Sequence, residues 1–383
     1  MRITKVWHSL IRVPLTETIE WGSGTRTGTT RLVCKIETDS GVTGWGETLS
    51  LIAAVPAVFE DVVAKLAIGY PVSDAERFHR HVLGAGYYHH KRAAVMAIAA
   101  MEMAMWDAFG KIAGQPLHAL WGGLWREEIE AAAYLFSADP AALSDRMKGF
   151  ADNGYTTFKV KIGFDAESDI ALAAAARQAV GALPMRLDVN GAWTPGTAKR
   201  QLNRLADLDP AYVEQPLELD DLQGHADLRA YSACPIALDE SAYTLTDVGN
   251  IARARAADVV LLDPHQAGGL WQVIKAAAIC EAFGIPVGLH SGAELALSQA
   301  AYLHLAACIP NASIAIDTEH AYLGGDIAGN APVITDGRFT VPTEPGLGIH
   351  ISEERVETYR VNEISGAYLD PARAGWFPVK PAY

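Results

Sequence analysis

Ionisable residues recur along the second half of the chain at a nearly constant step, each at the end of a short apolar run. They are Lys161, Asp188, Glu214, Asp239, Asp263, His290 and Asp317, and the steps between them are 27, 26, 25, 24, 27 and 27 residues. One strand, one helix and two short connections use about that many residues, so the pattern predicts parallel strands separated by helices. Such an even repeat is typical of a TIM-like (β/α)8 barrel and not of an open sheet.

Eight strands are expected in this barrel, and in barrels of this kind the chemistry lies at the carboxyl ends of the strands. The expected strands are residues 132–136, 157–162, 185–189, 211–214, 236–239, 259–263, 286–290 and 313–317. Asp188, Glu214 and Asp239 end three consecutive strands in this scheme. The spacing therefore predicts that these three carboxylates share one metal ion.

Composition excludes several classes of protein. The formal net charge is −14 over 383 residues and Lys/Arg runs never exceed two, which argues against a nucleic-acid partner. The four cysteines are far apart without CxxC spacing, so neither a zinc cluster nor a disulfide framework is expected. The first 15 residues lack the apolar core of a signal peptide, and the apolar helix expected at 93–113 contains Glu102, Asp107 and Lys111. We therefore expect a cytoplasmic protein with no membrane span.

Three regions are expected along the chain. Residues 1–125 should form an α+β capping domain, because strands at 3–14, 30–38 and 42–47 are followed by helices at 54–66, 74–83 and 93–113. Residues 16–29, rich in Gly and Thr, are expected to be a loop. Residues 126–335 should form the barrel and residues 336–383 a segment that packs back on the capping domain.

The strand-end motifs together resemble the enolase superfamily, and within it the mandelate racemase and muconate lactonizing enzyme branch. The motifs that carry the resemblance are Lys159-Val160-Lys161, Asp188-Val189-Asn190, Glu214-Gln215-Pro216, Asp239-Glu240-Ser241, Asp263 and His290, with Gly44-Trp45-Gly46-Glu47, Met105-Trp106-Asp107 and Leu120-Trp121-Gly122-Gly123 in the capping region. Each motif alone is weak, but the ordered set at barrel spacing is highly specific.

The resemblance implies Mg2+ held by Asp188, Glu214 and Asp239, with Asp239 preferred to the adjacent Glu240, and removal of a proton α to a carboxylate. Lys161 is then the expected base, and a pairing of a Lys or His base with Mg2+ is a known property of this superfamily. A lysine base must lose its proton near neutral pH, about three units below its reference pKa. Lys159, about 7 Å along the strand, is expected to help by repulsion.

Asp263 and His290 resemble the Asp/His dyad of mandelate racemase and of acid-sugar dehydratases, in which the aspartate would accept the Nδ1 proton of the histidine. Asp263 as a simple helix cap and His290 as a core histidine are the structural alternatives. The motifs Leu289-His290-Ser291 and Ile316-Asp317-Thr318 are especially similar to glucarate dehydratase. Asp239-Glu240-Ser241 departs from it, because glucarate dehydratase has an Asn at the third ligand, and this leaves the substrate open.

Further residues are candidates for substrate contact. Asn190 shares the face of Asp188, and Asp317 is favoured over Glu319 for hydrogen bonding to the substrate carboxylate. Trp21 and Arg26, with Glu20, lie in the first capping loop, which closes over the site in this family. The cluster Tyr87-Tyr88-His89-His90-Lys91-Arg92 either reaches over the barrel mouth or is a solvated helix start.

The expected activity is Mg2+-dependent dehydration of an acid sugar, an aldonate or aldarate, to a 2-keto-3-deoxy acid. The alternative is a racemase or epimerase at the α-carbon, and a third possibility is a metal-binding relative without catalysis. The substrate is expected to be a small carboxylate, and the resemblance implies a homo-oligomer, from dimer to octamer.

Overall fold

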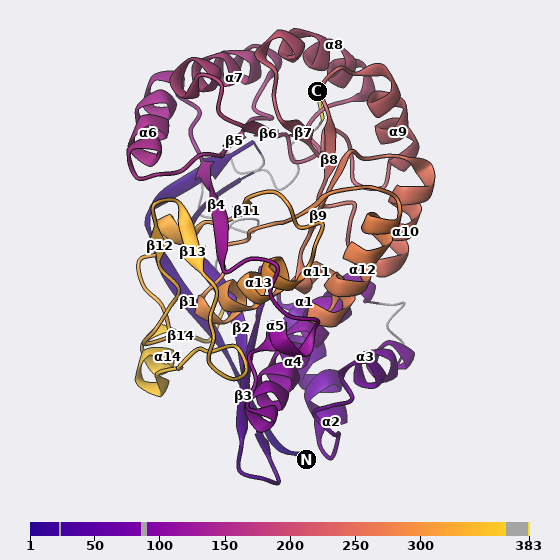
Figure 1. Cartoon of the computed structure of the whole chain (residues 1–383), viewed down its shortest axis with the longest axis vertical. Coiled ribbons are helices and arrows are strands. Elements are labelled where there is room, and N and C mark those ends of the chain that lie inside the picture. The colour runs from indigo at the N-terminus through magenta and orange to yellow at the C-terminus, as the bar shows by residue number, and fades with distance from the viewer. Residues whose placement is uncertain (23, 86–89, 365–381) are drawn as a thin grey trace.

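Two sheets organise the chain, as Figure 1 shows for this computed structural model, which describes residues 1–22, 24–85, 90–364 and 382–383. A four-stranded sheet has the order β14-β1-β2-β3, and a second sheet contains the parallel strands β4 to β10, with β11 paired to β4. The first sheet and its helices form the capping body, and the second forms the barrel. Both expected bodies are therefore present.

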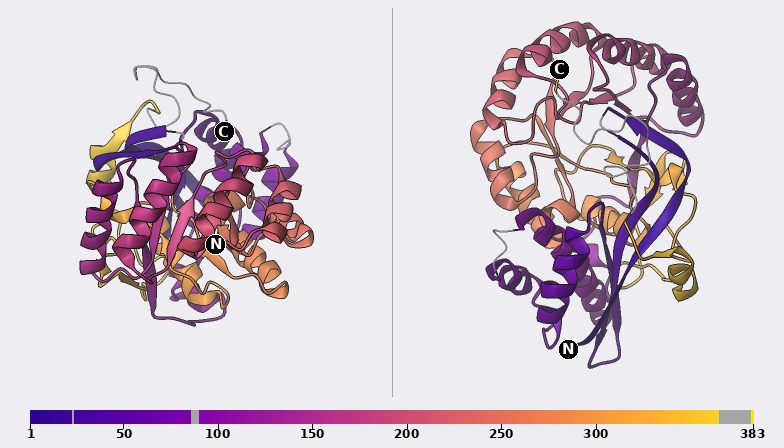
Figure 2. Two further views of the ribbon diagram at one scale, coloured as in Figure 1. Left: turned by 90° about the horizontal axis from the view of Figure 1, so that it is seen from above. Right: turned by 180° about the vertical axis from the view of Figure 1, so that it is seen from behind.

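The capping sheet is built from a long antiparallel hairpin of β1 (Ile3–Trp21) and β2 (Gly24–Thr38), followed by β3 (Thr43–Leu49). The expectation of a loop at 16–29 is wrong, because Ile19 pairs with Arg26 and Trp21 with Gly24 in the hairpin. Thr16, Thr18, Thr25, Thr27 and Thr29 recur at every second position on each arm of the hairpin, and such β-branched residues favour a strand. The end of the hairpin lies beside the barrel (Figure 2).

A glycine contact seats the hairpin end on the barrel. A Cβ atom at Gly22 would overlap the carbonyl oxygen of Gly163, which follows the second barrel strand. Only a residue without a side chain allows this backbone approach. The hairpin is thereby held over the carboxyl ends of the barrel strands.

The capping helices follow the sheet in the chain. They are α1 (Ala54–Val58), the π-helical turn η1 (Phe59–Val63), α2 (Ala64–Ala67), α3 (Ala75–Gly84), α4 (Lys91–Ala113) and α5 (Leu117–Leu120). Gly44 and Gly46 of β3 lie against the backbone of α4, where a Cβ at Gly46 would come 2.7 Å from the nitrogen of Ala104. Among the described helices, α4 alone is long and apolar enough to cross a membrane. However, 78% of its most apolar stretch is buried inside the protein. It is the core helix of the capping body.

All eight expected barrel strands are present, and each consecutive pair from β4 to β10 is parallel. They are β4 (Glu128–Leu135), β5 (Phe158–Lys161), β6 (Met185–Asp188), β7 (Tyr212–Glu214), β8 (Ile236–Leu238), β9 (Val259–Leu262), β10 (Val287–Leu289) and β11 (Ile316–Asp317). Ile316 and Asp317 pair with Ala131 and Ala132, so the last strand lies beside the first and closes the barrel. Almost every strand residue is buried, as expected when helices cover the outside.

Helices follow the barrel strands in the order that the repeat predicts. They are α6 (Pro140–Asp152), α7 (Ala166–Val180), α8 (Pro195–Leu205) with the 3₁₀ turn η3 (Ala206–Leu208), α9 (Leu222–Tyr231), α10 (Leu245–Ala254), α11 (Pro264–Ala267), α12 (Leu270–Ala282) and α13 (Ala296–Cys308). After β11 the chain forms only a short 3₁₀ turn, η4 (His320–Tyr322). The position of an eighth helix is therefore taken by a turn.

The C-terminal segment contacts both bodies. It contains β12 (Ile334–Thr335), β13 (Arg338–Thr340), α14 (Glu353–Tyr359) and β14 (Arg360–Val361). β14 pairs with β1 of the capping sheet, whereas β13 pairs with β4 of the barrel. Asp107 on α4 accepts the backbone N–H of both Trp45 and Leu347 at 2.9 Å, so one buried carboxylate joins a capping strand to this segment.

Glu102 ties the capping helix α4 to the barrel helix α12. Its carboxylate accepts the first two backbone N–H groups of α12, from Leu270 at 2.8 Å and Trp271 at 3.0 Å, and the indole N–H of Trp106 at 2.8 Å. The unsatisfied N–H groups of a helix N-terminus suit a carboxylate. Glu102 is thus a capping residue supplied by the other body.

Candidate active site

The three predicted metal ligands lie side by side at the mouth of the barrel. Asp188 ends β6 and is the register partner of Glu214 at the end of β7, and Asp239 directly follows β8. All three side chains are fully buried. The even repeat placed them on neighbouring strands, and parallel pairing brings their carboxylates to one edge.

Lys159 is surrounded by acids. Its ammonium nitrogen lies 2.6 Å from Glu214 Oε1, 2.6 Å from Asp317 Oδ2 and 3.1 Å from Asp188 Oδ2. Burial lowers the pKa of Lys159, but the three carboxylates outweigh burial and raise it well above its usual value. Lys159 is thus a firmly charged lysine held among three carboxylates, and its expected repulsion of Lys161 stays a prediction.

Lys161 extends from the end of β5 into the mouth of the barrel. Its ammonium nitrogen donates to Asp188 Oδ2 at 2.6 Å and to Asn190 Oδ1 at 2.7 Å. The ring of Tyr134 lies beneath both lysines, with its centroid 4.8 Å from the nitrogen of Lys159 and 5.2 Å from that of Lys161. Sequence reasoning missed Tyr134, which fixes both lysine side chains through its electron-rich face.

The acids at the strand ends carry more negative charge than the lysines compensate. Burial and the neighbouring Asp188 raise the pKa of Glu214 well above its usual value, whereas the two lysines outweigh burial and lower the pKa of Asp188. Glu214 Oε2 is buried and has no hydrogen-bond partner among the described residues. An oxygen-rich site with an unsatisfied carboxylate oxygen fits a hard divalent cation.

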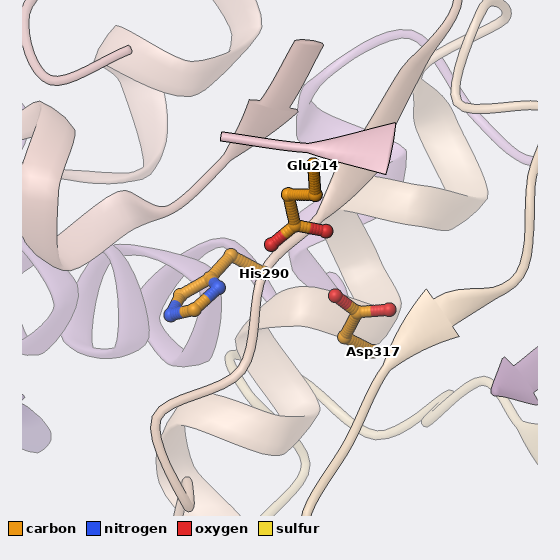
Figure 3. Close-up of side chains that lie close together, drawn as sticks. All are labelled: Glu214, His290 and Asp317. Carbon is orange, nitrogen blue, oxygen red and sulfur yellow. The ribbon is translucent and has the colours of Figure 1, made fainter. Parts of the chain in front are cut away.

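A second set of potential ligands overlaps the predicted one. Glu214, His290 and Asp317 each place one ligand atom within 4.8 Å of the others, as Figure 3 shows. Only Glu214 belongs to both sets. The difference arises because Lys159 draws Asp317 toward Glu214, so the carboxylates converge around an ammonium group.

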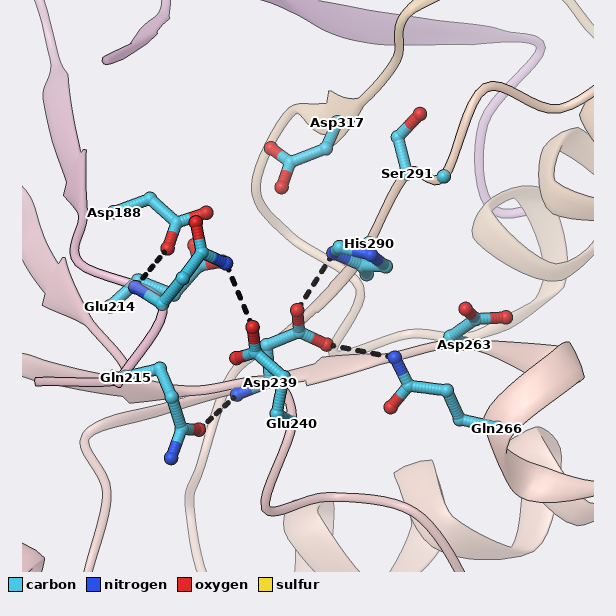
Figure 4. A network of polar contacts seen from close by, with 12 residues as sticks. Asp188, Glu214, Gln215, Asp239, Glu240, Asp263, Gln266, His290, Ser291 and Asp317 are labelled. Carbon is cyan, nitrogen blue, oxygen red and sulfur yellow. Dashed lines mark hydrogen bonds and ion pairs between the residues drawn. The ribbon is translucent and has the colours of Figure 1, made fainter. Parts of the chain in front are cut away.

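His290 has a different partner from the one expected. Its Nδ1 atom lies 2.9 Å from Asp239 Oδ2, and Figure 4 shows this ion pair beside Asp263. Burial lowers the pKa of His290, but Asp239 outweighs burial and raises it to about 10. His290 is therefore arranged as a proton donor.

Asp263 caps a helix. Its carboxylate accepts the backbone N–H of His265 at 2.6 Å, as the N-cap of α11, and the hydroxyl of Tyr302 at 3.0 Å. The expected hydrogen bond from His290 Nδ1 goes to Asp239 in place of Asp263 among the described residues, although Asp263 still lies close enough to help raise the pKa of His290. The helix cap, one of the two structural alternatives, is what the fold contains, because a proline at the first helical position starts a short helix at the strand end.

A cavity of about 340 Å³ lies between the two bodies above these residues, within the usual size range of small-molecule sites. The barrel contributes Lys161, Asn190, Asp239, Glu240, Gln266, His290 and Glu319, among others, to its lining. Trp21 and Arg26 line it from the hairpin end, in agreement with their predicted position over the site. Catalytic and capping residues thus face one space.

Of the two acids considered on the eighth strand, Glu319 lines the cavity and Asp317 does not. Asp317 lies deeper, where Arg186 donates to it at 3.0 Å and Lys159 at 2.6 Å. Arg26 forms a close ion pair with Glu319. The position of these side chains favours Glu319 over the expected Asp317 as a substrate contact, because a strand-face pattern does not give depth.

Asn190 lies between two charged cavity residues. It accepts a hydrogen bond from Lys161 and donates to Glu240 Oε1 at 2.7 Å, with a left-handed backbone φ of 48°. The sequence suggested Glu240 only as an alternative to Asp239 for the third metal ligand. In the structure Glu240 lines the cavity and has one buried oxygen without a hydrogen-bond partner among the described residues. In the cluster at 87–92, Tyr87, Tyr88 and His89 lie outside the described residues.

Sequence reasoning also missed a group of capping residues in the lining. They are Leu49, Leu51, Ile52, Val55 and Met96. These residues carry no catalytic signal, and only the docking of the capping body on the barrel makes them part of the site.

Comparison with known families agrees with this architecture. The model of the family described as "Mandelate racemase / muconate lactonizing enzyme, N-terminal domain" matches residues 7–122, and that described as "Enolase C-terminal domain-like" matches residues 142–355. The first match lies in the capping body, and the second covers most of the barrel.

Similar proteins have different named activities. "Probable glucarate dehydratase" of Streptomyces coelicolor is 31% identical over 366 residues, covering 86% of this chain and 84% of that protein. The structure of N-succinyl Arg/Lys racemase from Bacillus cereus has a TM-score of 0.88 at 26% identity, covering 94% of this chain and 98% of that one. The structure of muconate lactonizing enzyme from Pseudomonas fluorescens also has a TM-score of 0.88, at 28% identity, covering 94% and 99%.

Proposed function

We propose that this chain, which belongs to the mandelate racemase and muconate lactonizing enzyme branch of the enolase superfamily, is a Mg2+-dependent lyase. It dehydrates an acid sugar to a 2-keto-3-deoxy acid. The observation that carries this proposal is that Lys161, at the end of β5, and His290, directly after β10, line the same cavity with Asp239 between them in strand order. In this proposal Lys161 removes the proton from the α-carbon, and His290 supplies a proton to the departing β-hydroxyl.

Asp188, Glu214 and Asp239 are the residues proposed to hold Mg2+. All three offer buried oxygen atoms, and the unpartnered Oε2 of Glu214 supports the assignment. When bound, the ion supplies positive charge that stabilises the developing negative charge on the substrate carboxylate.

Lys161 is proposed as the base. Its Nζ atom, in the neutral form, takes the proton from the carbon α to the carboxylate, and the hydrogen bond to Asn190 directs the nitrogen toward the cavity. His290, held as a cation by Asp239, gives its proton to the departing β-hydroxyl, which leaves as water. The resulting enol takes up a proton at the β-carbon to give the 2-keto-3-deoxy acid, so one water is lost and no oxidant is required.

The capping body covers part of the cavity and so reduces the access of bulk water to the reacting groups. Trp21 closes one side of the cavity, and Arg26 joins the hairpin to Glu319 at the eighth strand. Removing water strengthens the interaction of charged groups with the reacting carbon. The ion pair therefore joins the capping body to the barrel beside the catalytic residues.

An α-carbon racemase or epimerase is the second candidate. The relative from Bacillus cereus bears the name of a racemase, and the Asp239-Glu240-Ser241 motif is of the muconate type. In that reaction one of the two groups would remove the proton and the other return it on the opposite face.

Incubating the protein with Mg2+ and a library of acid sugars and other α-hydroxy or α-amino acids in D2O tests the proposal. Keto-acid formation supports the lyase. Exchange of the α-proton for deuterium without keto acid would replace it with the racemase. Absence of both reactions across the library would favour a metal-binding relative without catalysis.

A further inference from the structure

The cavity has two chemically different ends. Its floor is polar, with Lys161, Asn190 and His290 beside two buried acceptor oxygens that lack partners, Glu240 Oε2 and Gln266 Oε1. These groups suit a carboxylate and the hydroxyls next to it. The floor is where the proposed reaction takes place.

The roof, which is the part contributed by β3, α1, α4 and the intervening segment, is apolar. Its side chains are Leu49, Leu51, Ile52, Val55 and Met96. None of them carries a group that can pair with a hydroxyl or a carboxylate. A substrate fixed by its carboxylate at the floor places its distal end against these side chains.

The roof begins close to the catalytic groups. A Cβ atom at Gly292, two residues after His290, would lie 3.4 Å from the nearest methyl carbon of Leu49. Leu49 therefore packs directly above the strand end that carries His290. Only a short polar portion of a substrate fits before its chain meets the apolar surface.

Polar distal groups would be penalised in this roof. A hydroxyl buried without a hydrogen-bond partner costs about 1–3 kcal/mol, whereas each buried methyl or methylene gains about 0.8 kcal/mol. A second carboxylate would fare worse, because the side-chain cations among the described lining residues are Lys161, His290 and Arg26. The first two face the reacting end, and Arg26 is already paired with Glu319.

We propose that the substrate is a deoxy acid sugar with hydroxyls only near its carboxylate and an apolar alkyl group at its distal end. This inference rests on the proposed function and narrows it: acid sugars whose terminal carbon bears no oxygen are favoured over aldarates and fully hydroxylated aldonates. Ile52 supports this inference. It is an apolar side chain that is 45% exposed, and its position in the roof assigns it a role in contacting the distal end of the substrate.

Matched substrate pairs test the proposal. The two members of each pair share the configuration at the α- and β-carbons; one ends in a methyl group, and the other ends in a hydroxymethyl or a carboxylate group. We expect kcat/KM for the methyl-ended acid to exceed that for the hydroxymethyl-ended acid at least tenfold, which corresponds to about 1.4 kcal/mol. Equal or reversed preference would overturn the inference while leaving the lyase proposal intact.

Binding measured by calorimetry on the same pairs in Mg2+ separates the two proposals. If no acid is turned over but the methyl-ended members bind at least tenfold more tightly, the lyase proposal fails and the inference on substrate class stands. If the members bind equally, the inference fails whatever the turnover.

Two exposed isoleucines provide a variant and its control. Ile52→Thr adds a hydroxyl to the roof without emptying a core, and we expect the tenfold preference to fall to about threefold or less. Ile68→Thr makes the same change at a residue that is 52% exposed and lies outside the cavity lining, and the preference should be unchanged. An unaltered preference in Ile52→Thr would contradict the assignment of the roof.

Discussion

Replacing Lys159 by Met should destabilise the protein by leaving a buried acid without its cation. Of the three carboxylates around Lys159, Asp317 keeps Arg186 at 3.0 Å and Asp188 keeps Lys161 at 2.6 Å. Glu214 is the acid that loses its ion-pair partner, at 2.6 Å. Breaking one buried pair by removing one member costs about 3–5 kcal/mol, so we expect that loss in the free energy of unfolding.

Two conditions should reduce this loss. Lowering the pH lets Glu214 take up a proton, and the cost then falls by at most about 1.4 kcal/mol per pH unit. Mg2+ should stabilise the variant more than the wild type, because Lys159 no longer competes for Glu214. A ligand present at 100 times its dissociation constant contributes about 2.7 kcal/mol, so much of the loss should be recovered.

Urea denaturation of wild type and variant, in EDTA and in Mg2+ at pH 8 and pH 6, measures these effects. Lys65→Met is the control, because Lys65 forms only an exposed pair with Asp61 one helical turn away, and such pairs contribute about 0.3–0.5 kcal/mol. If Lys159→Met in EDTA at pH 8 were as stable as the control, the reasoning on the buried acids would be refuted.

Lys161→Ala and His290→Asn should each abolish at least one stereochemical direction of α-proton exchange while Mg2+ still binds; full turnover in both variants, measured by NMR in D2O, would contradict the assigned roles. Burial raises the pKa of Glu102 from 4.5 to about 7, so folding favours the protonated form of this side chain. The resulting contribution to the stability of the folded protein is fully present below pH 4.5 and is lost as the pH rises toward 7. Stability should fall by up to about 3 kcal/mol across that range, and Glu102→Gln should flatten this part of the urea stability profile; an unchanged slope would show that the acid is ionised throughout. Gly46→Ala should cost about 1–3 kcal/mol because its Cβ has no space against α4, whereas Gly249→Ala, in an open position of α10, should be neutral or stabilising; equal thermal melting of the two variants would disprove the tight packing of β3 on α4.

The sequence by itself determined the barrel and the residues at its strand ends. Parallel pairing requires a strand, a helix and two connections in each repeat, so the even spacing fixed that Asp188, Glu214 and Asp239 lie on neighbouring strands. The same argument placed Lys161 and His290 at the same end of the barrel. These are properties of the chain's periodicity, and they hold whatever the side-chain conformations are.

Only the tertiary structure decided which groups contact one another. Asp239 and not Asp263 pairs with His290, and Glu319 and not Asp317 reaches the cavity, because these outcomes depend on depth and side-chain direction within a shared face. The apolar roof arises from the docking of two bodies whose contacts are far apart in sequence. Local pattern sets the period of the elements, whereas the packing of distant segments sets the chemistry that the cavity presents.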